Sequence, residues 1–186
     1  RRGGRGCGSR TRGIHMGGAG SSPRFDTIDF ITLASTGNAT DFGNLQSART
    51  CESASNQTRG LALGGSQPGG NTDQIDFITI ATTGTCTDFG DLAANRFGMA
   101  SMSSSTRATF AGGRAHPSYY TQTEDLDGTS WTEVAELSTA VYNGSSAGTK
   151  TSGWVAGGIA SAPTQPAATQ EWEAPSAVQV KTVTIS

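Results

Sequence analysis

Few residues in this sequence of 186 have the chemistry that catalysis needs. Its two histidines, His15 and His116, stand without the nucleophile and acidic partner of a catalytic triad. We expect His15 to be packed or hydrogen-bonded inside a strand, and His116 to be a polar residue of a loop. The histidines therefore predict no acid–base catalyst.

The most clustered carboxylates are Glu124, Asp125 and Asp127. A glycosidase needs two carboxylates that face each other roughly 5 to 10 Å apart. Nothing in the spacing of these three predicts such a pair, whereas Asp127-Gly128 is a strong signal for a tight turn between two strands. We interpret the cluster as part of a β-hairpin and expect the protein not to be an enzyme.

Ligands for a metal ion or a cofactor are equally scarce. Cys7, Cys51 and Cys86 include no CxxC pair and have no histidine at metal-ligand spacing. Asp41 and Asp88 recur in equivalent contexts, which favours capping of turn amides, although repeated Asp-rich turns can also bind calcium. The sequence predicts no metal site, no disulfide framework and no cofactor.

The overall charge indicates no strong electrostatic partner, because the net charge is −2 and charged residues make up 15% of the chain. The glycine-rich start resembles an RGG-type nucleic-acid tail, but the repeat described below explains most of it as a strand. Its arginines are Arg1, Arg2, Arg5, Arg10 and Arg12. It also lacks the Lys-Ser or Lys-Thr ending of a phosphate loop. We expect no nucleic-acid partner and, since no apolar run is long enough to span a bilayer, no membrane insertion.

Three blocks of the sequence recur at a single separation of 47 residues. The matching pairs are Thr11–Gly18 with Thr58–Gly65, Ile28–Leu33 with Ile75–Ile80, and Thr40–Leu45 with Thr87–Leu92. A shared offset of this kind is the signature of a repeat protein, in which each unit is completed by its neighbours.

A glycine doublet carries this period through the whole chain, at spacings of 47, 48 and 45. The doublets, which we interpret as structural, are Gly17-Gly18, Gly64-Gly65, Gly112-Gly113 and Gly157-Gly158. Each follows a short run that we expect to be the inner strand of its repeat, packed against neighbouring repeats, because glycine lets another backbone pass close by. The predicted units are 2–48, 49–95, 96–139 and 140–186.

Each unit contains material for about four strands and none for a sustained helix. Glycine accounts for 26 residues, and β-branched and aromatic residues occur in short runs, as is typical of many short strands joined by tight turns. We predict an all-β protein whose four repeats form one domain over residues 1–186. The chain starts with Arg1 rather than Met, and we expect a processed product or a segment of a longer chain.

The third unit resembles a kelch repeat, in which an apolar strand ends in Gly-Gly and a later strand and turn lead to a Trp. Here Thr109–Gly113 is followed by the tryptophan-containing segment Thr123–Val134. The fourth unit keeps its doublet and Trp172, while the first two place Phe42 and Phe89 where a kelch unit has Trp. The resemblance implies a β-propeller of four kelch-like repeats, each blade with about four antiparallel strands, either closed by itself or part of a larger ring.

Repeats with Ile-Asp-Phe-Ile-Thr followed by Thr-Asp-Phe-Gly are also similar to kelch-like arrays in structural and tail-fibre proteins of marine and cyanobacterial tailed phages. This resemblance implies a non-enzymatic virion structural protein of a phage tail, tail fibre or other appendage, extracellular when mature, that acts in assembly or host attachment. A cellular kelch-type module for protein–protein interaction is the alternative, and a galactose-oxidase-like or lyase-like enzyme ranks last.

The segments after the doublets differ most between repeats, at residues 19–27, 66–74, 114–122 and 159–169. A scaffold that repeats its strands and changes its loops is suited to presenting surfaces. We predict recognition residues in the first and third of these loops, namely Arg24, Phe25, His116, Tyr119 and Tyr120. The expected partners are other virion proteins or copies of the same chain in an oligomer, and a glycan or protein of the host surface.

Overall fold

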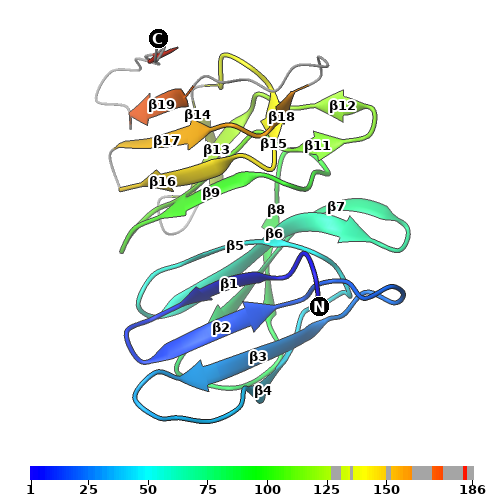
Figure 1. Ribbon diagram of the computed structural model, residues 1–186, viewed down its shortest axis with the longest axis vertical. Coiled ribbons are helices and arrows are strands. Elements are labelled where there is room, and N and C mark those ends of the chain that lie inside the picture. Colours follow the sequence, from blue (N-terminus) through cyan, green and yellow to red (C-terminus); the bar gives the residue numbers. More distant parts are fainter. Residues whose placement is uncertain (127–130, 135, 150–151, 161–168, 174–181, 184–186) are drawn as a thin grey trace. The chain divides into compact units, whose positions relative to one another are not determined.

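The computed structural model describes residues 1–126, 131–134, 136–149, 152–160, 169–173 and 182–183. In these residues every regular element is a β-strand, and the strands form separate open sheets (Figure 1). The all-β prediction is therefore confirmed. The chain divides into two compact units, Arg1–Phe97 and Gly98–Ser186. The single domain expected from the sequence stays a prediction.

The first unit contains two four-stranded antiparallel sheets in which each strand pairs with the next along the chain. The first sheet consists of β1 (Arg5–Gly8), β2 (Arg12–Met16), β3 (Thr27–Thr32) and β4 (Thr40–Asn44). The second consists of β5 (Glu52–Ser55), β6 (Arg59–Gln67), β7 (Gly70–Thr79) and β8 (Thr87–Asp91).

The second unit repeats this plan with two further four-stranded antiparallel sheets. The third sheet consists of β9 (Ala100–Ser103), β10 (Ala108–Ala111), β13 (Thr123–Leu126) and β14 (Trp131–Val134). The fourth consists of β16 (Ser145–Gly148), β17 (Ser152–Ala156), β19 (Thr169–Glu173) and β20 (Thr182–Val183). Two short pairs accompany them, β11 (Arg114–Ala115) with β12 (Ser118–Tyr119) and β15 (Val141–Tyr142) with β18 (Ile159–Ala160).

Each of the four sheets lies within one sequence repeat, and the strand pairing has the same register in all four. The second and third strands of each sheet pair His15 with Asp29, Ala62 with Asp76, Phe110 with Glu124 and Val155 with Gln170. The first two sheets also share a shift of register at one place, between Ile28 and Asp29 and between Ile75 and Asp76. The sequence repeat is therefore also a repeat in three dimensions.

The glycine doublet follows the second strand in three of the sheets and lies within the second strand, β6, in the other. The expectation that this strand is the inner one of its repeat stays a prediction. The second strand is hydrogen-bonded on both sides. Within each unit, the first strand of a sheet, at the sheet edge, lies beside its counterpart in the other sheet, β1 beside β5 and β9 beside β16 (Figure 1). The first strand is short and built of small or polar residues, so its position was not evident from hydrophobicity.

Small side chains make this edge contact close. Ser53 Oγ donates to the carbonyl of Gly6 at 2.9 Å, and Ser55 Oγ donates to the carbonyl of Gly8 at 2.9 Å. At the entrance to the strand, Arg5 Nε lies 2.6 Å from a carboxylate oxygen of Glu52. Each of these contacts joins a residue to the one 47 positions later. Equivalent residues of consecutive repeats therefore lie side by side.

Positive φ at the doublets allows the next repeat to pass close by. Gly17 and Gly18 have φ of 58° and 116°, and a Cβ at Gly17 would lie 2.4 Å from the carbonyl oxygen of Arg49. The amide of Gly18 donates to that same carbonyl at 2.9 Å. A side chain at Gly17 would therefore displace the segment that leads into the second repeat.

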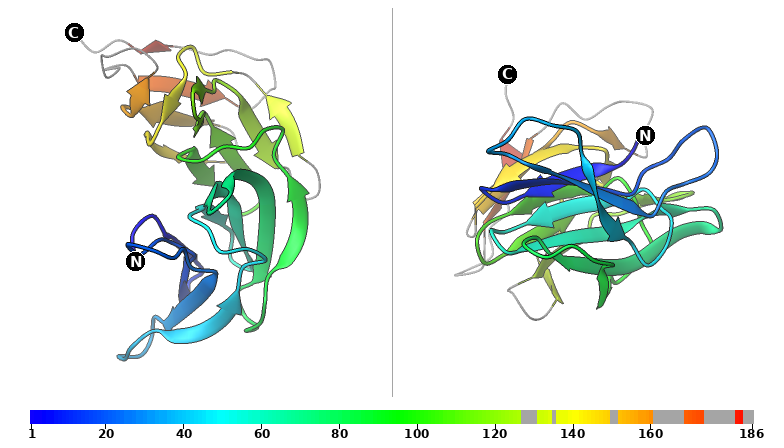
Figure 2. Two further views of the ribbon diagram at one scale, coloured as in Figure 1. Left: turned by 90° about the vertical axis from the view of Figure 1, so that its right-hand side faces the viewer. Right: turned by 90° about the horizontal axis from the view of Figure 1, so that it is seen from below.

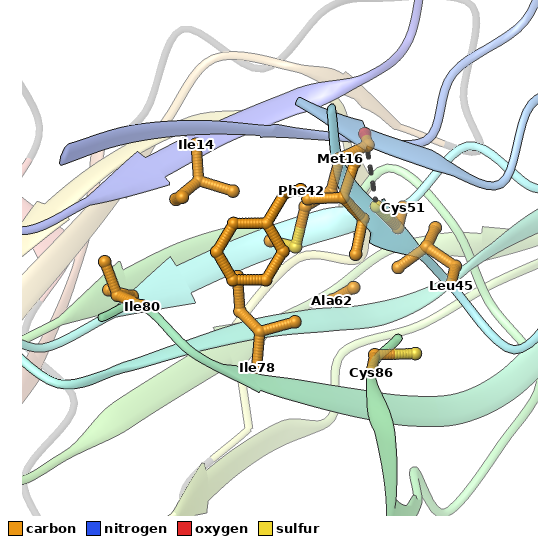
Figure 3. Close-up of a cluster of buried hydrophobic side chains, with 10 residues drawn as sticks. Ile14, Met16, Phe42, Leu45, Cys51, Ala62, Ile78, Ile80 and Cys86 are labelled. Carbon is orange, nitrogen blue, oxygen red and sulfur yellow. Dashed lines mark hydrogen bonds between the residues drawn. The ribbon is translucent and has the colours of Figure 1, made fainter. Parts of the chain in front are cut away.

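The core of the first unit lies between its two sheets, which face each other (Figure 2). One side of this core comes from the first repeat, namely Ile14, Met16, Ile28, Phe42 and Leu45. The other side comes from the second repeat, namely Cys51, Ala62, Ile78, Ile80 and Cys86 (Figure 3). Phe42 also meets Phe30 edge-on, with ring centroids 6.0 Å apart. The apolar side chains of each sheet thus bury the apolar face of the other.

Equivalent residues of the first two repeats are buried to very different degrees. Ile78 and Ile80 are 3% and 1% exposed because they pack on the first sheet. Their counterparts 47 positions earlier, Ile31 and Leu33, are 43% and 53% exposed. One face of the first sheet, with Ile14 and Phe42, is therefore covered by the second sheet. Its other face, with Ile31 and Leu33, is exposed.

This difference predicts unequal effects of the same substitution at equivalent positions. Ile78→Ala should lower the free energy of unfolding by about 2 to 5 kcal/mol, because it opens a cavity in the core. Ile31→Ala should change it by about 0.5 kcal/mol or less in dilute solution. Urea unfolding of both variants measures the two values, and equal losses would contradict the packing described here.

Candidate recognition surface

The loop after the third doublet folds into a small hairpin of its own. Strand β11 begins at Arg114, directly after Gly113, and pairs with β12 so that Arg114 lies opposite Tyr119. The amide of Tyr120 then donates to the carbonyl of Gly113 at 3.0 Å, which returns the chain to its starting point. His116 lies exposed at the connection between the two strands.

The guanidinium of Arg114 packs against two tyrosine rings, one in this hairpin and one in β15 (Val141–Tyr142). Its guanidinium carbon is 5.0 Å from the ring centroid of Tyr119 and 5.4 Å from that of Tyr142 in β15. The two rings meet edge-on, with centroids 5.7 Å apart. Arg114 Nη2 is also 2.7 Å from Nδ1 of His116, while no described residue accepts a hydrogen bond from its Nε. Cation–π stacking therefore contributes to holding the guanidinium in place.

The structure thus brings Tyr119 and His116, both predicted, to Arg114 and Tyr142, which sequence analysis missed. Tyr142 belongs to the fourth repeat, so its approach to the third loop is a long-range contact without a local sequence signal. Arg114 had a weak signal, since it takes the place after the doublet that Ala19, Ser66 and Ile159 occupy in the other repeats. Tyr120 is half-buried next to this cluster in the chain.

The predicted residues of the first loop make contacts within the first unit. Arg24 is half-buried and donates from Nη2 to Ser66 Oγ at 2.6 Å and from Nε to the carbonyl of Ser66. Phe25 is half-buried, with the guanidinium of Arg1 at 6.0 Å from its ring centroid. These contacts tie the first loop to the second loop and to the N-terminus. The third loop therefore offers the better-formed surface for a partner.

His15 lies on the open face of the first sheet, and its surroundings are structural. Nη2 of Arg1 lies 3.0 Å from Nδ1 of His15 and also forms an ion pair with Asp29. Partial burial and the charge of Arg1 lower the pKa of His15. A neutral imidazole held by an arginine agrees with the expected hydrogen-bonded role.

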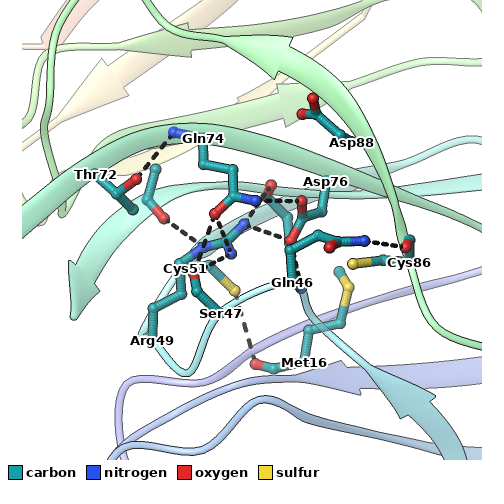
Figure 4. Close-up of polar contacts among 12 residues, drawn as sticks. Met16, Gln46, Ser47, Arg49, Cys51, Thr72, Gln74, Asp76, Cys86 and Asp88 are labelled. Carbon is teal, nitrogen blue, oxygen red and sulfur yellow. Dashed lines mark hydrogen bonds and ion pairs between the residues drawn. The ribbon is translucent and has the colours of Figure 1, made fainter. Parts of the chain in front are cut away.

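Arg49 and Asp76 form a fully buried ion pair in the first unit, 2.9 Å apart (Figure 4). The guanidinium also donates to the carbonyl of Gly64 at 3.1 Å and to Ser47 Oγ at 3.1 Å. Gln74 Nε2 donates to the second carboxylate oxygen of Asp76 at 3.1 Å. Such partners compensate for the removal of both charges from water, so the network ties residues 46–49 to β6 and β7.

In every repeat, the position equivalent to Asp76 has an acidic or amide side chain. In the first repeat Arg1 takes the arginine's role and pairs with Asp29. In the third, Arg96 and Glu124 are buried at the equivalent positions. In the fourth, Gln170 accepts hydrogen bonds from Ser138 Oγ and the amide of Thr139. The carboxylates at this position therefore belong to the architecture of the repeat.

The other carboxylates singled out in the sequence also have structural contacts. Asp125 is buried, 2.8 Å from Arg107 Nη2, and accepts a hydrogen bond from Thr109 Oγ at 2.8 Å. Asp88 accepts a hydrogen bond from the amide of Gly90 at 3.2 Å, but both residues lie within β8, at its register shift, so the contact is structural without capping a turn. Asp41 is exposed. Asp127 and the predicted turn lie outside the described residues, but the flanking strands β13 and β14 pair antiparallel. Within the described part of the chain, no three His, Cys, Asp or Glu side chains are grouped to hold a metal ion.

All three cysteines are free thiols. Cys51 and Cys86 are buried in the core of the first unit, and Cys7 is half-buried beside it. Burial raises the pKa of each thiol from an ordinary value of 9.0 to about 12. The thiols are therefore protonated and poorly nucleophilic at neutral pH.

No protein-family model matches this sequence, and no curated protein matches it. Among the described residues, no helix is long and apolar enough to cross a membrane.

The buried ion pair predicts an asymmetric response to substitution. Arg49→Met leaves the carboxylate of Asp76 buried without its cation and should lower the free energy of unfolding by about 3 to 5 kcal/mol. The double variant Arg49→Met with Asp76→Leu removes both charges and should recover part of that loss. Chemical denaturation of the two variants tests this, and a loss of less than about 1 kcal/mol for the single variant would rule out a structural role for the pair.

The thiol pKa values predict a loss of stability at alkaline pH. Between pH 9 and about 12 the unfolded thiols lose protons that the folded thiols retain, so the free energy of unfolding falls as pH rises through this range. Replacing Cys51 and Cys86 by Ala should make the fall from pH 8 to pH 10.5 smaller. Unfolding measured at both pH values gives the comparison, and an equal fall in the two proteins would show that the thiols do not contribute.

Proposed function

We propose that the protein is a non-enzymatic array of kelch-like repeats, a β-propeller whose blades are the four-stranded sheets, and that it serves as a structural part of a phage tail, tail fibre or related appendage. The main support for the repeat array is the set of contacts between residues 47 positions apart, such as Ser55 with Gly8. The phage role rests on the resemblance of the sequence motifs.

The edge contacts support the propeller. In such a fold, successive blades are related by one rotation, so the same position of each blade faces its neighbour near the axis. In the first unit this relation holds between β1 and β5. In the second unit Ser146 Oγ of β16 donates to the carbonyl of Ser101 in β9 at 2.8 Å, 45 positions earlier. The four sheets either close one ring or form part of a larger one.

The third loop supplies the recognition surface in this proposal. Tyrosine rings bind the apolar faces of sugars and the surfaces of proteins while their hydroxyl groups stay hydrated. Arg114 orders two such rings, Tyr119 and Tyr142, and exposed His116 adds a polar group at the tip. Because the surface is held in place before a partner arrives, little conformational entropy is lost on binding. We propose a surface glycan or protein of the host cell as its ligand.

Loss of the aromatic cluster should abolish recognition without unfolding the protein. The double variant Tyr119→Ala with Tyr120→Ala, and Arg114→Ala separately, should each reduce binding to a microarray of bacterial surface glycans or to host cells at least tenfold. A matched variant in the second loop, Gln67→Ala with Asn71→Ala, should bind like the wild type. Unchanged binding by the double variant would exclude the third loop as the recognition surface, and absence of the chain from purified virions by mass spectrometry would exclude the virion role.

A further inference from the structure

Arg114 is a half-buried cation to which no described carboxylate is paired. Other buried or half-buried arginines have stronger acceptors. Arg49 and Arg107 each pair with an aspartate, at 2.9 and 2.8 Å, and Arg24 donates to the carbonyl and the hydroxyl of Ser66. Because a charge that is partly removed from water is costly without a partner, the guanidinium of Arg114 favours an anion that comes from outside the chain.

The guanidinium also has hydrogen-bond donors to spare. Its Nη2 lies 2.7 Å from Nδ1 of His116, while its Nε and Nη1 have no acceptor among the described residues. Since a guanidinium can only donate, Nδ1 of His116 accepts, and the imidazole is neutral with its proton on Nε2. The exposed His116 therefore places a second donor next to the cation.

Two tyrosine rings border these donors. The centroids of Tyr119 and Tyr142 are 5.0 and 5.4 Å from the guanidinium carbon of Arg114, and the rings meet edge-on. Both tyrosines are half-buried, so part of each remains open to solvent. Tyrosine rings pack against apolar surfaces such as the C–H face of a sugar ring while their hydroxyl groups stay hydrated. An acidic sugar combines such a face with a carboxylate in a single residue.

We propose that the third loop binds an acidic saccharide, with a sugar carboxylate at Arg114 and His116 and the sugar ring against Tyr119 and Tyr142. The terminal nitrogens of a guanidinium can donate two parallel hydrogen bonds to one carboxylate, which favours this planar anion over a neutral hydroxyl group. All four residues belong to the second unit. This inference rests on the recognition role given to the third loop in the proposed function, and it names the class of ligand.

Chemical removal of the sugar carboxylates tests the ligand class with the wild-type protein. Acidic polysaccharides from bacterial surfaces would be treated with a carbodiimide and borohydride, which turns each carboxylate into a primary alcohol and keeps the sugar ring. Binding of the full chain to the reduced polysaccharides should be at least tenfold weaker than to the untreated ones. Equal binding to both forms, or binding to neutral glycans alone, would overturn the acidic-sugar proposal. The third loop would still be the recognition surface if the Tyr119→Ala, Tyr120→Ala variant lost that binding.

A variant of the cation shows whether Arg114 is the group that meets the carboxylate. Arg114→Gln should weaken binding to the untreated polysaccharides at least tenfold and should leave the weak binding to the reduced ones unchanged, because the two changes remove the same interaction. Arg10→Gln removes the same charge at an exposed position of the first unit and should bind like the wild type. Circular dichroism and thermal melting should show that both variants are folded. Losses that add up when the folded Arg114→Gln variant meets the reduced polysaccharides would place the carboxylate elsewhere and overturn the proposal.

Protease treatment of host cells separates a sugar ligand from an acidic protein. Binding of the wild-type chain should persist after the treatment. Binding that disappears would identify a protein as the partner of the third loop and would overturn the saccharide proposal. Absence of binding to every glycan and to untreated cells would contradict the recognition function itself, so failure of the ligand class and failure of the proposed function give different results.

Discussion

In the first unit, each sheet depends on burial of an apolar face against the other sheet. A four-stranded sheet of about 40 residues cannot cover itself, and the first unit shows how two of them solve the problem together. Met16 and Phe42 from one repeat and Ile78 and Ile80 from the next form one core. The repeat is therefore a unit of sequence, whereas the pair of facing sheets is the smallest unit that buries a core.

Polar contacts set how the facing sheets are aligned. The buried guanidinium of Arg49 bonds to the backbone of β6 and to the carboxylate of Asp76 in β7, while the backbone carbonyl of Arg49 accepts a hydrogen bond from Gly18 in the preceding repeat. One residue thus connects two strands of its own sheet to the doublet of the sheet before. Apolar packing could tolerate several alignments, but a buried charge with directional partners tolerates few.

Much of the fold could be predicted from the sequence, because recurring residues report recurring strands. The offset of 47 and the glycine doublets located all four sheets, and the Asp127-Gly128 signal agreed with the pairing of the strands around it. Other features left no local trace. Ile31 and Ile78 are the same residue in the same motif, and only the position of a repeat in the array decides whether its isoleucine is exposed. The short first strands, rich in Gly, Ser and Ala, have little strand propensity, so their place beside the neighbouring sheet emerges only in three dimensions. Tyr142 reaches Arg114 from another repeat, which no inspection of the third loop alone could show.

The side-by-side placement of equivalent residues also affects how such a protein can change through evolution. Inserting one residue within β5 would displace Ser53 and Ser55 from the glycines of β1, whereas the gain or loss of one complete repeat would preserve every such contact. The segments Thr11–Gly18 and Thr58–Gly65, identical at five of eight positions, are the kind of similar sequence between which recombination adds or removes a repeat. The length of the array is therefore free to vary in single genetic events, and the loops after the doublets are free to diverge one by one.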